Sequence, residues 1–244
     1  QVPETVIKRM YAQLADNKVP SGITVIKPEE LAQIWYKPRD LSAYKKVIHI
    51  GDIHGCCKPL KEYLQEISPE NYYVFLGDYI DRGRAEVIKL LLQLAQLENV
   101  TLLEGNHEAS LRDYGLADGA GSKEFRMQTA GELAKAGLSR KAVYSLYRRL
   151  SQCFCYTYHG KKVLASHGGL ARMPENLSLV AAAELIYGTG EYEDGLTVDM
   201  SFAEHAADNE YQVHGHRNYE GVPVEVNEHC FNLDGAVEMG GQLR

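Results

Sequence analysis

Three short motifs in the first half of the chain combine acidic, imidazole and amide side chains with glycine. They are GDIHG at 51–55, GDYIDRG at 77–83 and GNHE at 105–108. Each follows a run of apolar residues, and polar groups beside such buried segments need partners. Carboxylate, amide and imidazole ligands together suit manganese, iron or zinc better than calcium, which prefers oxygen alone. The motifs therefore predict a transition-metal site.

Two histidine motifs in the second half add candidate ligands. HGGL at 167–170 follows the apolar run VLAS, and HGH at 214–216 follows YQV. Each motif alone is weak evidence, because Asp and His are common in turns and helix caps. Their joint occurrence, each after an apolar run, indicates a shared centre. It has enough ligands for two ions, which a carboxylate such as Asp78 can bridge.

The elements expected to carry the first three motifs alternate between strand and helix. Apolar strand patterns cover 47–50, 72–76 and 100–103, and helical patterns cover 60–67 and 85–97. Short strand–helix–strand connections favour a parallel sheet with right-handed crossovers. In open α/β sheets, ligands bind beyond the carboxyl ends of the strands. The motifs lie at those ends.

The second half of the chain has a different order of elements. Residues 122–150 have a mostly helical pattern, and 154–169 predict a hairpin with Gly160 and Lys161 at its turn. A helix is expected over 177–187, followed by short strands around QVHG, VPVEV and CFNLDG. Because few helices separate these strands, we expect a second, more antiparallel sheet.

Residues 1–40 contain none of the candidate ligands. Short helices are expected over 3–14 and 28–35, on either side of ITVIK, and YKPRD at 36–40 has the composition of a linker. We therefore divide the chain into an N-terminal extension or linker, 1–40, and a metal-binding domain, 41–244. The chain begins without Met or an apolar signal region, so we expect a fragment of a longer protein.

The composition is that of a globular protein with a sizeable core. The chain has 244 residues, of which 45% are hydrophobic and 24% are charged. Five cysteines without repeat spacing disfavour a disulfide framework and favour a reducing cytoplasm. No apolar run reaches the roughly 18 residues needed to cross a membrane. The net charge of −7 argues against broad coating of nucleic acid, but not against a metal site that holds one strand end.

The motifs GDIHG, GDYIDRG, GNHE, HGGL and GH together resemble those of the calcineurin-like metallophosphoesterases. The DRG and HGGL forms are most similar to the phosphoprotein-phosphatase branch. This resemblance implies an α/β fold, an αββα sandwich of two mixed sheets flanked by helices, with a dinuclear metal site at the sheet edge. It also implies a hydrolase in which a metal-bridging hydroxide attacks phosphorus in line.

The resemblance also assigns metal ligands. His216 is favoured over His214, because the family ligand directly follows glycine. Two divalent transition-metal ions are expected as cofactors, manganese first, with iron, zinc or nickel as the alternatives. The first ion would be held by Asp52, His54 and the bridging Asp78, and the second by Asp78, Asn106, His167 and His216.

Further residues take catalytic and substrate-binding roles by the same resemblance. Arg82 and Asn106 would bind the substrate phosphate, Arg82 through its fork of donors. His107 would protonate or otherwise stabilise the leaving oxygen. Asp81 would orient His107, as carboxylates commonly do for catalytic imidazoles.

Three departures weaken the similarity to eukaryotic Ser/Thr phosphatases. Glu104 precedes GNHE, where those enzymes usually have Arg, and Ala171-Arg172 follow HGGL in place of Ser-Pro. A second phosphate-binding Arg is expected between HGGL and GH, where Arg172 is the only arginine before Arg217. None of these positions belongs to the expected metal site.

The two ends of the chain bear on the substrate. VPETVIKRMYAQL at 2–14 resembles the segment after the lid of P-loop polynucleotide kinases. CFNLDGAVEMGGQLR at 230–244 resembles the end of the phosphatase module in bacterial and phage polynucleotide kinase-phosphatases. Together they predict a phosphatase for 3′ or 2′,3′-cyclic phosphates at RNA ends, acting in end-healing repair beside an upstream kinase domain. Tyr and Arg side chains in YSLYRR, 144–149, are candidates for contacts to such an end.

Other functions compete with this prediction. Within enzymes, the alternatives are a Ser/Thr protein phosphatase and a dinucleoside polyphosphate hydrolase. A non-catalytic binding scaffold is the alternative from another class. Such a scaffold would lack some of the ligands, and none is missing from this sequence.

Overall fold

The computed structural model describes residues 3–16, 26, 30, 36–64, 67–82, 84, 86–116, 121–218 and 224–244. The chain divides into two compact units, Gln1–Tyr36 and Lys37–Arg244. In the first unit, helix α1 spans Glu4–Asp16, close to the expected range. The expected helix over 28–35 and the segment ITVIK lie largely outside the described residues. In the part of the chain that is described, no helix is long and apolar enough to cross a membrane.

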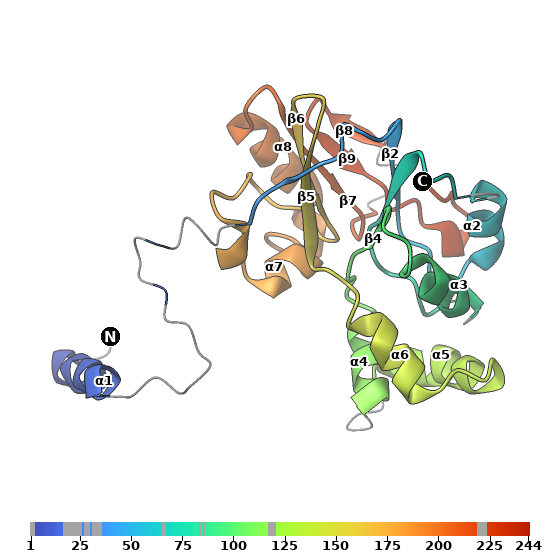
Figure 1. The fold of residues 1–244 in the computed structure, drawn as a ribbon, viewed down its shortest axis with the longest axis horizontal. Coiled ribbons are helices and arrows are strands. Elements are labelled where there is room, and N and C mark those ends of the chain that lie inside the picture. The colour runs from blue at the N-terminus through green and yellow to red at the C-terminus, as the bar shows by residue number, and fades with distance from the viewer. Residues whose placement is uncertain are drawn as a thin grey trace. The chain divides into compact units, whose positions relative to one another are not determined.

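The smaller sheet contains three parallel strands in the order β2-β3-β4 (Figure 1). Ile50, Phe75 and Leu102 stand in register, so the loops after these strands leave the sheet at one edge. The predicted alternation of strands and helices is therefore confirmed. Its elements are β2 (Lys46–Ile50), α2 (Cys57–Tyr63), β3 (Asn71–Phe75), α3 (Glu86–Leu94) and β4 (Val100–Leu102).

The larger sheet contains six strands in the order β1-β5-β6-β7-β9-β8. The hairpin of β5 and β6 was expected, but its turn is His159-Gly160, with φ of 47° and 83°, and Lys161 begins β6. The expected linker YKPRD contains β1, which pairs with β5. The strands are β1 (Arg39–Asp40), β5 (Cys153–Tyr158), β6 (Lys161–Ser166), β7 (Glu210–His214), β8 (Glu225–Asn227) and β9 (Cys230–Asn232).

The larger sheet is more antiparallel than the smaller one, as expected, because β5 pairs with β6 and β8 with β9 in antiparallel, but its other three pairings are parallel. β6 pairs with β7 in parallel, as β7 does with β9 and β1 with β5. The reason is a helical crossover between β6 and β7, which returns the chain to the starting edge. It contains α7 (Ala182–Tyr187), which lies within the helix expected over 177–187, and α8 (Gly195–His205), which the sequence pattern did not predict. The single helix expected over 177–187 is instead the 3₁₀ turn Leu177–Leu179 followed by α7.

Alternating side chains on the strands produce the layers. In and just after β3, Tyr72, Val74 and Leu76 face the core between the two sheets, while Tyr73 and Phe75 face the outer core that holds α2 and α3 residues. On the larger sheet, Leu164 and Cys155 pack outward against Leu185 of α7. The result is an αββα sandwich, and the expected fold class is confirmed. None of the five cysteines, all of which lie in the described part of the chain, forms a disulfide.

Three further helices follow the last strand of the smaller sheet (Figure 1). They are α4 (Ala109–Leu116), α5 (Lys123–Lys135) and α6 (Arg140–Tyr147). Ser122 and Ser139 cap α5 and α6, each accepting a hydrogen bond from a backbone N–H in the first turn. These caps divide the helical pattern of 122–150 into two helices.

Arg217 is fully buried. Its guanidinium donates to the backbone carbonyls of Gly168, Tyr187, Thr189 and Glu191, at 2.7 to 3.2 Å. It therefore fixes the HGGL loop to the segment that follows α7. Because its donors are used on the backbone, Arg217 does not supply the second phosphate-binding arginine of the expected pattern.

We predict that Arg217→Met lowers the free energy of unfolding by at least about 3 kcal/mol, because it leaves several buried carbonyls without donors. Urea unfolding followed by circular dichroism measures the change. The control is Arg172→Met at an exposed position, which should change stability by less than about 0.5 kcal/mol. A loss no larger for Arg217→Met than for the control would contradict the role.

Candidate metal and phosphate site

A pocket of about 500 Å³ lies where the strand-end loops of both sheets meet. The smaller sheet contributes the loops after β2, β3 and β4, and the larger sheet contributes the loops after β7 and β9. The described residues that line it are Asp52, His54, Asp78, Arg82, Asn106, His107, Tyr192, His216, Asn218, Asp234, Ala236, Glu238 and Met239.

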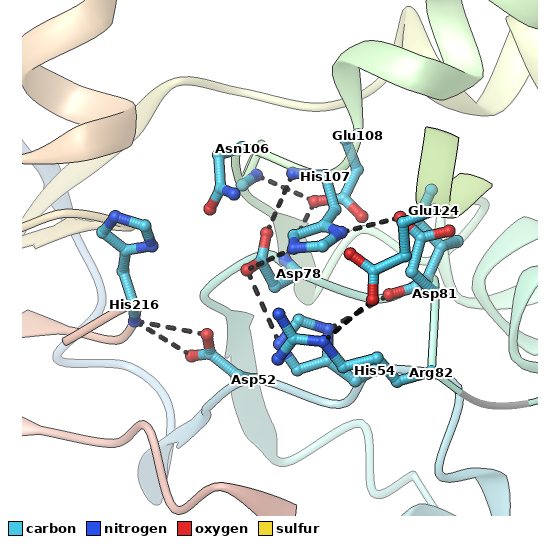
Figure 2. Close-up of polar contacts among 12 residues, drawn as sticks. Asp52, His54, Asp78, Asp81, Arg82, Asn106, His107, Glu108, Glu124 and His216 are labelled. Carbon is cyan, nitrogen blue, oxygen red and sulfur yellow. Dashed lines mark hydrogen bonds and ion pairs between the residues drawn. The ribbon is translucent and has the colours of Figure 1, made fainter. Parts of the chain in front are cut away.

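Asp78 lies at the centre of this site, between His216 on one side and His107 on the other (Figure 2). It is buried and has a left-handed backbone with φ of 49°. Its Oδ1 lies 3.3 Å from Nε2 of His167, and its Oδ2 lies 3.7 Å from Nε2 of His54 and 3.9 Å from Nε2 of His107. The two oxygens therefore face different imidazoles, as a carboxylate shared by two ions requires.

Main-chain carbonyls fix which nitrogen of each histidine faces the pocket. Nδ1 of His167 bonds the carbonyl of Leu76 at 2.9 Å, and Nδ1 of His54 bonds the carbonyl of Ile80 at 3.1 Å. Because a carbonyl only accepts, Nδ1 carries the proton in both rings and Nε2 is left toward Asp78. Such hydrogen bonds orient imidazole ligands in metal sites.

Two groups of side chains can each hold an ion, and both include Asp78. In each, the candidate ligand atoms lie within 4.8 Å of one another. The groups are His54, Asp78 and His107, and Asp78, His167 and His216. The first group therefore contains His107, whereas the sequence-based assignment gave Asp52 to the first ion together with His54 and Asp78. A third such group, Asp81, His107 and Glu124, lies beside them.

Asn106 gives a direct test of whether the second group fits a cation. Its carbonyl oxygen lies 3.1 Å from Nε2 of His167. With the amide reversed, its nitrogen lies 3.0 to 3.3 Å from His167, His216 and both oxygens of Asp78. With His167 neutral, as coordination requires, four acceptor atoms converge on one amide, and an NH₂ group can serve only two. A cation serves all of them, so the residues fit a divalent metal.

The two histidines of the second group, His167 and His216, differ in their protonation. Burial alone would lower the pKa of His167, but the charges of Asp78, Asp52 and Glu108 raise it to about 10. Burial, together with His167, lowers the pKa of His216 to about 3. Burial would likewise raise the pKa of Asp78, but the surrounding imidazoles keep it well below its usual value. In the metal-free protein, protonated His167 therefore forms an ion pair with the carboxylate of Asp78.

Asp52 joins the two sheets across the pocket. Its carboxylate accepts the backbone N–H of His216 at 3.2 to 3.3 Å (Figure 2). Gly215 passes so close that a Cβ there would overlap the carboxylate. Burial and the nearby Asp234 raise the pKa of Asp52 well above its usual value. Asp52 borders the pocket, while its assignment as a ligand stays a prediction.

His214 and His216 point to different surroundings. Nε2 of His214 lies 3.0 Å from Oδ1 of Asp199, and its Nδ1 lies 3.0 Å from the carbonyl of Gly215. His214 is fully buried and is not among the described residues that line the pocket. The structure therefore brings His216, and not His214, to Asp78.

His107 is held by a buried carboxylate from the β3 loop. Its Nδ1 lies 2.7 Å from Oδ2 of Asp81, whose other oxygen accepts from the hydroxyl of Thr129. Burial alone would lower the pKa of His107, but Asp81, Asp78 and Glu108 raise it to about 9. The ring is therefore protonated at neutral pH in the metal-free protein, with Nε2 toward the pocket.

Arg82 borders the same pocket, and its side chain is 38% exposed. Its Nε donates to Glu124 at 3.1 Å, and one terminal nitrogen donates to Glu238 at 2.6 Å. Arg82 and Asp81 both have a left-handed backbone, with φ of 55° for Arg82 and 64° for Asp81. This strained turn directs the two side chains into the same region (Figure 2).

Several residues that line the pocket were not predicted from the sequence. Asp234 follows β9, which is parallel to β7, so the strand-end argument applied to CFNLDG would have found it. Tyr192, Asn218 and Glu238 come from loops or short 3₁₀ turns and have no periodic signal. The stretch YSLYRR does not border this pocket: its Tyr144 and Arg148 line a separate depression along α6.

The sequence pattern of the calcineurin-like phosphoesterases matches residues 45–226 of the chain. Among curated proteins, the serine/threonine-protein phosphatase PP2A-like PPG1 of Candida albicans is 34% identical over 123 residues. That alignment covers 45% of this chain and 29% of the relative. The chain therefore spans less than a third of the length of that phosphatase.

Solved structures share the fold. A putative diadenosine tetraphosphatase has a TM-score of 0.61 at 20% identity, covering 84% of this chain and 89% of its own. A serine/threonine phosphatase of Saccharomyces cerevisiae with similarity to human PP5 has a TM-score of 0.52 at 18% identity. The match covers 96% of this chain and 84% of that phosphatase. At these identities the likeness concerns the fold alone.

We predict that the chelated protein binds two Mn²⁺ ions and releases about one proton from His167 at pH 8, because coordination needs the neutral ring. The raised pKa of His167, about 10, means that apparent affinity should increase as pH rises toward that value. Titration calorimetry in buffers of different ionisation enthalpy counts the protons, and elemental analysis counts the ions. His167→Gln should abolish this release, whereas His205→Gln, at an exposed position of α8, should not. Unchanged release in His167→Gln would contradict the assignment.

Proposed function

The chain belongs to the calcineurin-like phosphoesterase family, and we propose that it is a phosphomonoesterase that removes single phosphate groups, as Ser/Thr protein phosphatases do. It is a metal-dependent phosphoesterase with shared His and Asp groups for the ions. The proposal concerns the substrate and the roles of the residues. The observation that carries it is that Arg82 and His107 border the same pocket as Asp78, which both ion groups share.

The proposed mechanism gives each side chain one task. When bound, two divalent ions supply positive charge to the phosphate and activate a water molecule for in-line attack. Arg82 binds phosphate oxygens through its guanidinium, and the amide of Asn106 helps to hold them. His107 donates the proton on Nε2 to the leaving oxygen, while Asp81 accepts from Nδ1 and keeps the ring in place.

The charge of the pocket supports a single phosphate group. Among its described lining residues, Arg82 is the only Lys or Arg, and Asp234 and Glu238 add negative charge. A polyphosphate chain brings several negative charges and would need further cations. This disfavours a dinucleoside polyphosphate. The similarity to a PP2A-like phosphatase, at 34% identity, supports a phosphorylated Ser or Thr.

A phosphate at a polynucleotide end is the second candidate. The segment 230–244, which resembles the end of polynucleotide kinase-phosphatases, supplies Asp234, Glu238 and Met239 to the pocket. Tyr192 also borders the pocket, with its ring 5.3 Å from that of His216, and an aromatic ring can stack with a base. The relative with 34% identity is a serine/threonine-protein phosphatase, so this candidate ranks second.

We predict that the Mn²⁺-loaded protein has a kcat/KM at least about tenfold higher on a phosphoserine peptide than on diadenosine tetraphosphate, because one arginine serves one phosphate group. Phosphate release measures all substrates, which include a 3′-phosphorylated oligoribonucleotide and a 2′,3′-cyclic nucleotide. Chelated protein and Asp78→Asn should be inactive. Preference for the oligoribonucleotide would replace the leading proposal with the second.

We predict that His107→Ala lowers kcat by about 10²–10⁴-fold on an alkyl phosphate, whose leaving oxygen needs a proton. On nitrophenyl phosphate the loss should be much smaller, because nitrophenolate leaves without protonation. His159→Ala, at a turn distant in the fold from the pocket, is the control. Equal losses on both esters, or loss of a bound ion, would instead make His107 a metal ligand, as the first ion group allows.

A further inference from the structure

Carboxylates hold Arg82 at two of its three nitrogens. Glu124, on α5, contacts Nε at 3.1 Å, and its side chain is 34% exposed. Glu238 contacts one terminal nitrogen at 2.6 Å, and its side chain is only 6% exposed. The terminal nitrogens of an arginine are the ones that grip two oxygens of a phosphate. Glu238 therefore occupies a position that a bound phosphate would need.

Glu238 is poorly satisfied in this position. Its Oε1 lies 4.0 Å from Nε2 of His54 in addition to its contact with Arg82. Its Oε2 is buried and has no hydrogen-bond donor among the described protein groups. Asp234 lines the same pocket and adds another negative charge. A buried carboxylate with one unsatisfied oxygen and an acidic neighbour is costly, so another anion can displace it from Arg82.

The segment that carries Glu238 can yield without unfolding the sheet. Glu238 lies in a single 3₁₀ turn, Val237–Met239, followed by Gly240 with φ of 92°. Met239 is 80% exposed, and nothing lies within 4 Å of a Cβ built on Gly240. The family pattern ends at residue 226, so Glu238 comes from a segment beyond it.

We propose that Glu238 is an internal competitor for Arg82, which the phosphate group of a substrate must displace in order to bind. The inference rests on the proposed function, since it takes this pocket as the phosphate site. Displacement is complete before the chemical step, so it costs the same for the bound substrate and the transition state. Glu238 therefore sets the KM for phosphate substrates and the affinity for inorganic phosphate, and leaves kcat unchanged.

The test compares inorganic phosphate binding to Mn²⁺-loaded wild-type protein and Glu238→Gln by titration calorimetry. The amide keeps the size of the side chain but removes its charge, so the Kd for phosphate should fall about tenfold. KM for nitrophenyl phosphate should fall by the same factor at constant kcat. Glu124→Gln is the matched control, since it removes the more exposed carboxylate at Nε, and it should change the Kd less than about twofold.

A double-mutant cycle separates competition for Arg82 from a general change of pocket charge. In an Arg82→Ala background, Glu238→Gln should no longer improve phosphate binding. An equal improvement in that background would overturn the proposal. So would unchanged or weaker phosphate binding in the single variant, which would make Glu238 a positioning residue for Arg82, or the loss of a bound ion, which would make it a metal ligand.

Phosphate binding does not depend on turnover, so the two proposals fail separately. A protein that hydrolyses no phosphoester but binds phosphate more tightly after Glu238→Gln would refute the proposed function and keep the competition. Normal hydrolysis with an unchanged phosphate Kd in Glu238→Gln would refute the competition and keep the proposed function. Thermal unfolding of each variant shows that the comparison concerns folded protein.

Discussion

The buried carboxylate of Glu108 accepts three backbone N–H groups, and the geometry of the metal site depends on this contact. The donors are Asp78 and Tyr79 after β3 and Gly105 after β4, at 2.8 to 2.9 Å. A side chain at Gly105 would overlap both Asp78 and Glu108. The loops after two neighbouring strands are thereby fixed to each other, with Asp78 between them. Backbone bonds from Ile53 and from its neighbour His54 to the carbonyl of Asp78 add the loop after β2.

This interlocking explains how the site maintains unfavourable backbone conformations. Among the described residues, six of the seven non-glycine residues with positive φ belong to the site: His54, Asp78, Asp81, Arg82, His216 and Ala236. Each such residue costs about 1–3 kcal/mol and persists only when surrounding contacts require it. Glu108, Asp52 and the carbonyls that accept from the histidines supply those contacts. The strained backbone orients the candidate ligand side chains before any ion is bound. This lowers the entropy cost of ordering those side chains when an ion binds.

Residues at strand ends could be predicted from the sequence. Apolar strands followed by polar motifs located Asp78, Asn106 and His167, because parallel strands necessarily deliver their ends to one edge. The parallel pairing of β6 with β7 in the larger sheet could not be predicted, since α8 has weak helical periodicity and its crossover was missed. The choice of His216 over His214 came from the resemblance to the family motif, because the position at the strand end does not by itself separate the two. Adjacent strand-end residues can point to opposite sides, and in the structure the contact of His214 with Asp199 separates them.

Electrostatics links metal binding to phosphate binding in this pocket. Its described lining residues include four carboxylates, those of Asp52, Asp78, Asp234 and Glu238, against two cations, the guanidinium of Arg82 and the protonated ring of His107. Without ions such a pocket repels a phosphate dianion, whatever hydrogen bonds it offers. Two divalent cations reverse the sign of this balance, because the ions are the largest local charges. The carboxylates beyond the ligand set then limit how positive the loaded pocket becomes. Under the proposed function, we expect such a site to bind phosphate only when metal is present and to release it more readily than a purely cationic pocket would, which suits the release of a phosphate product.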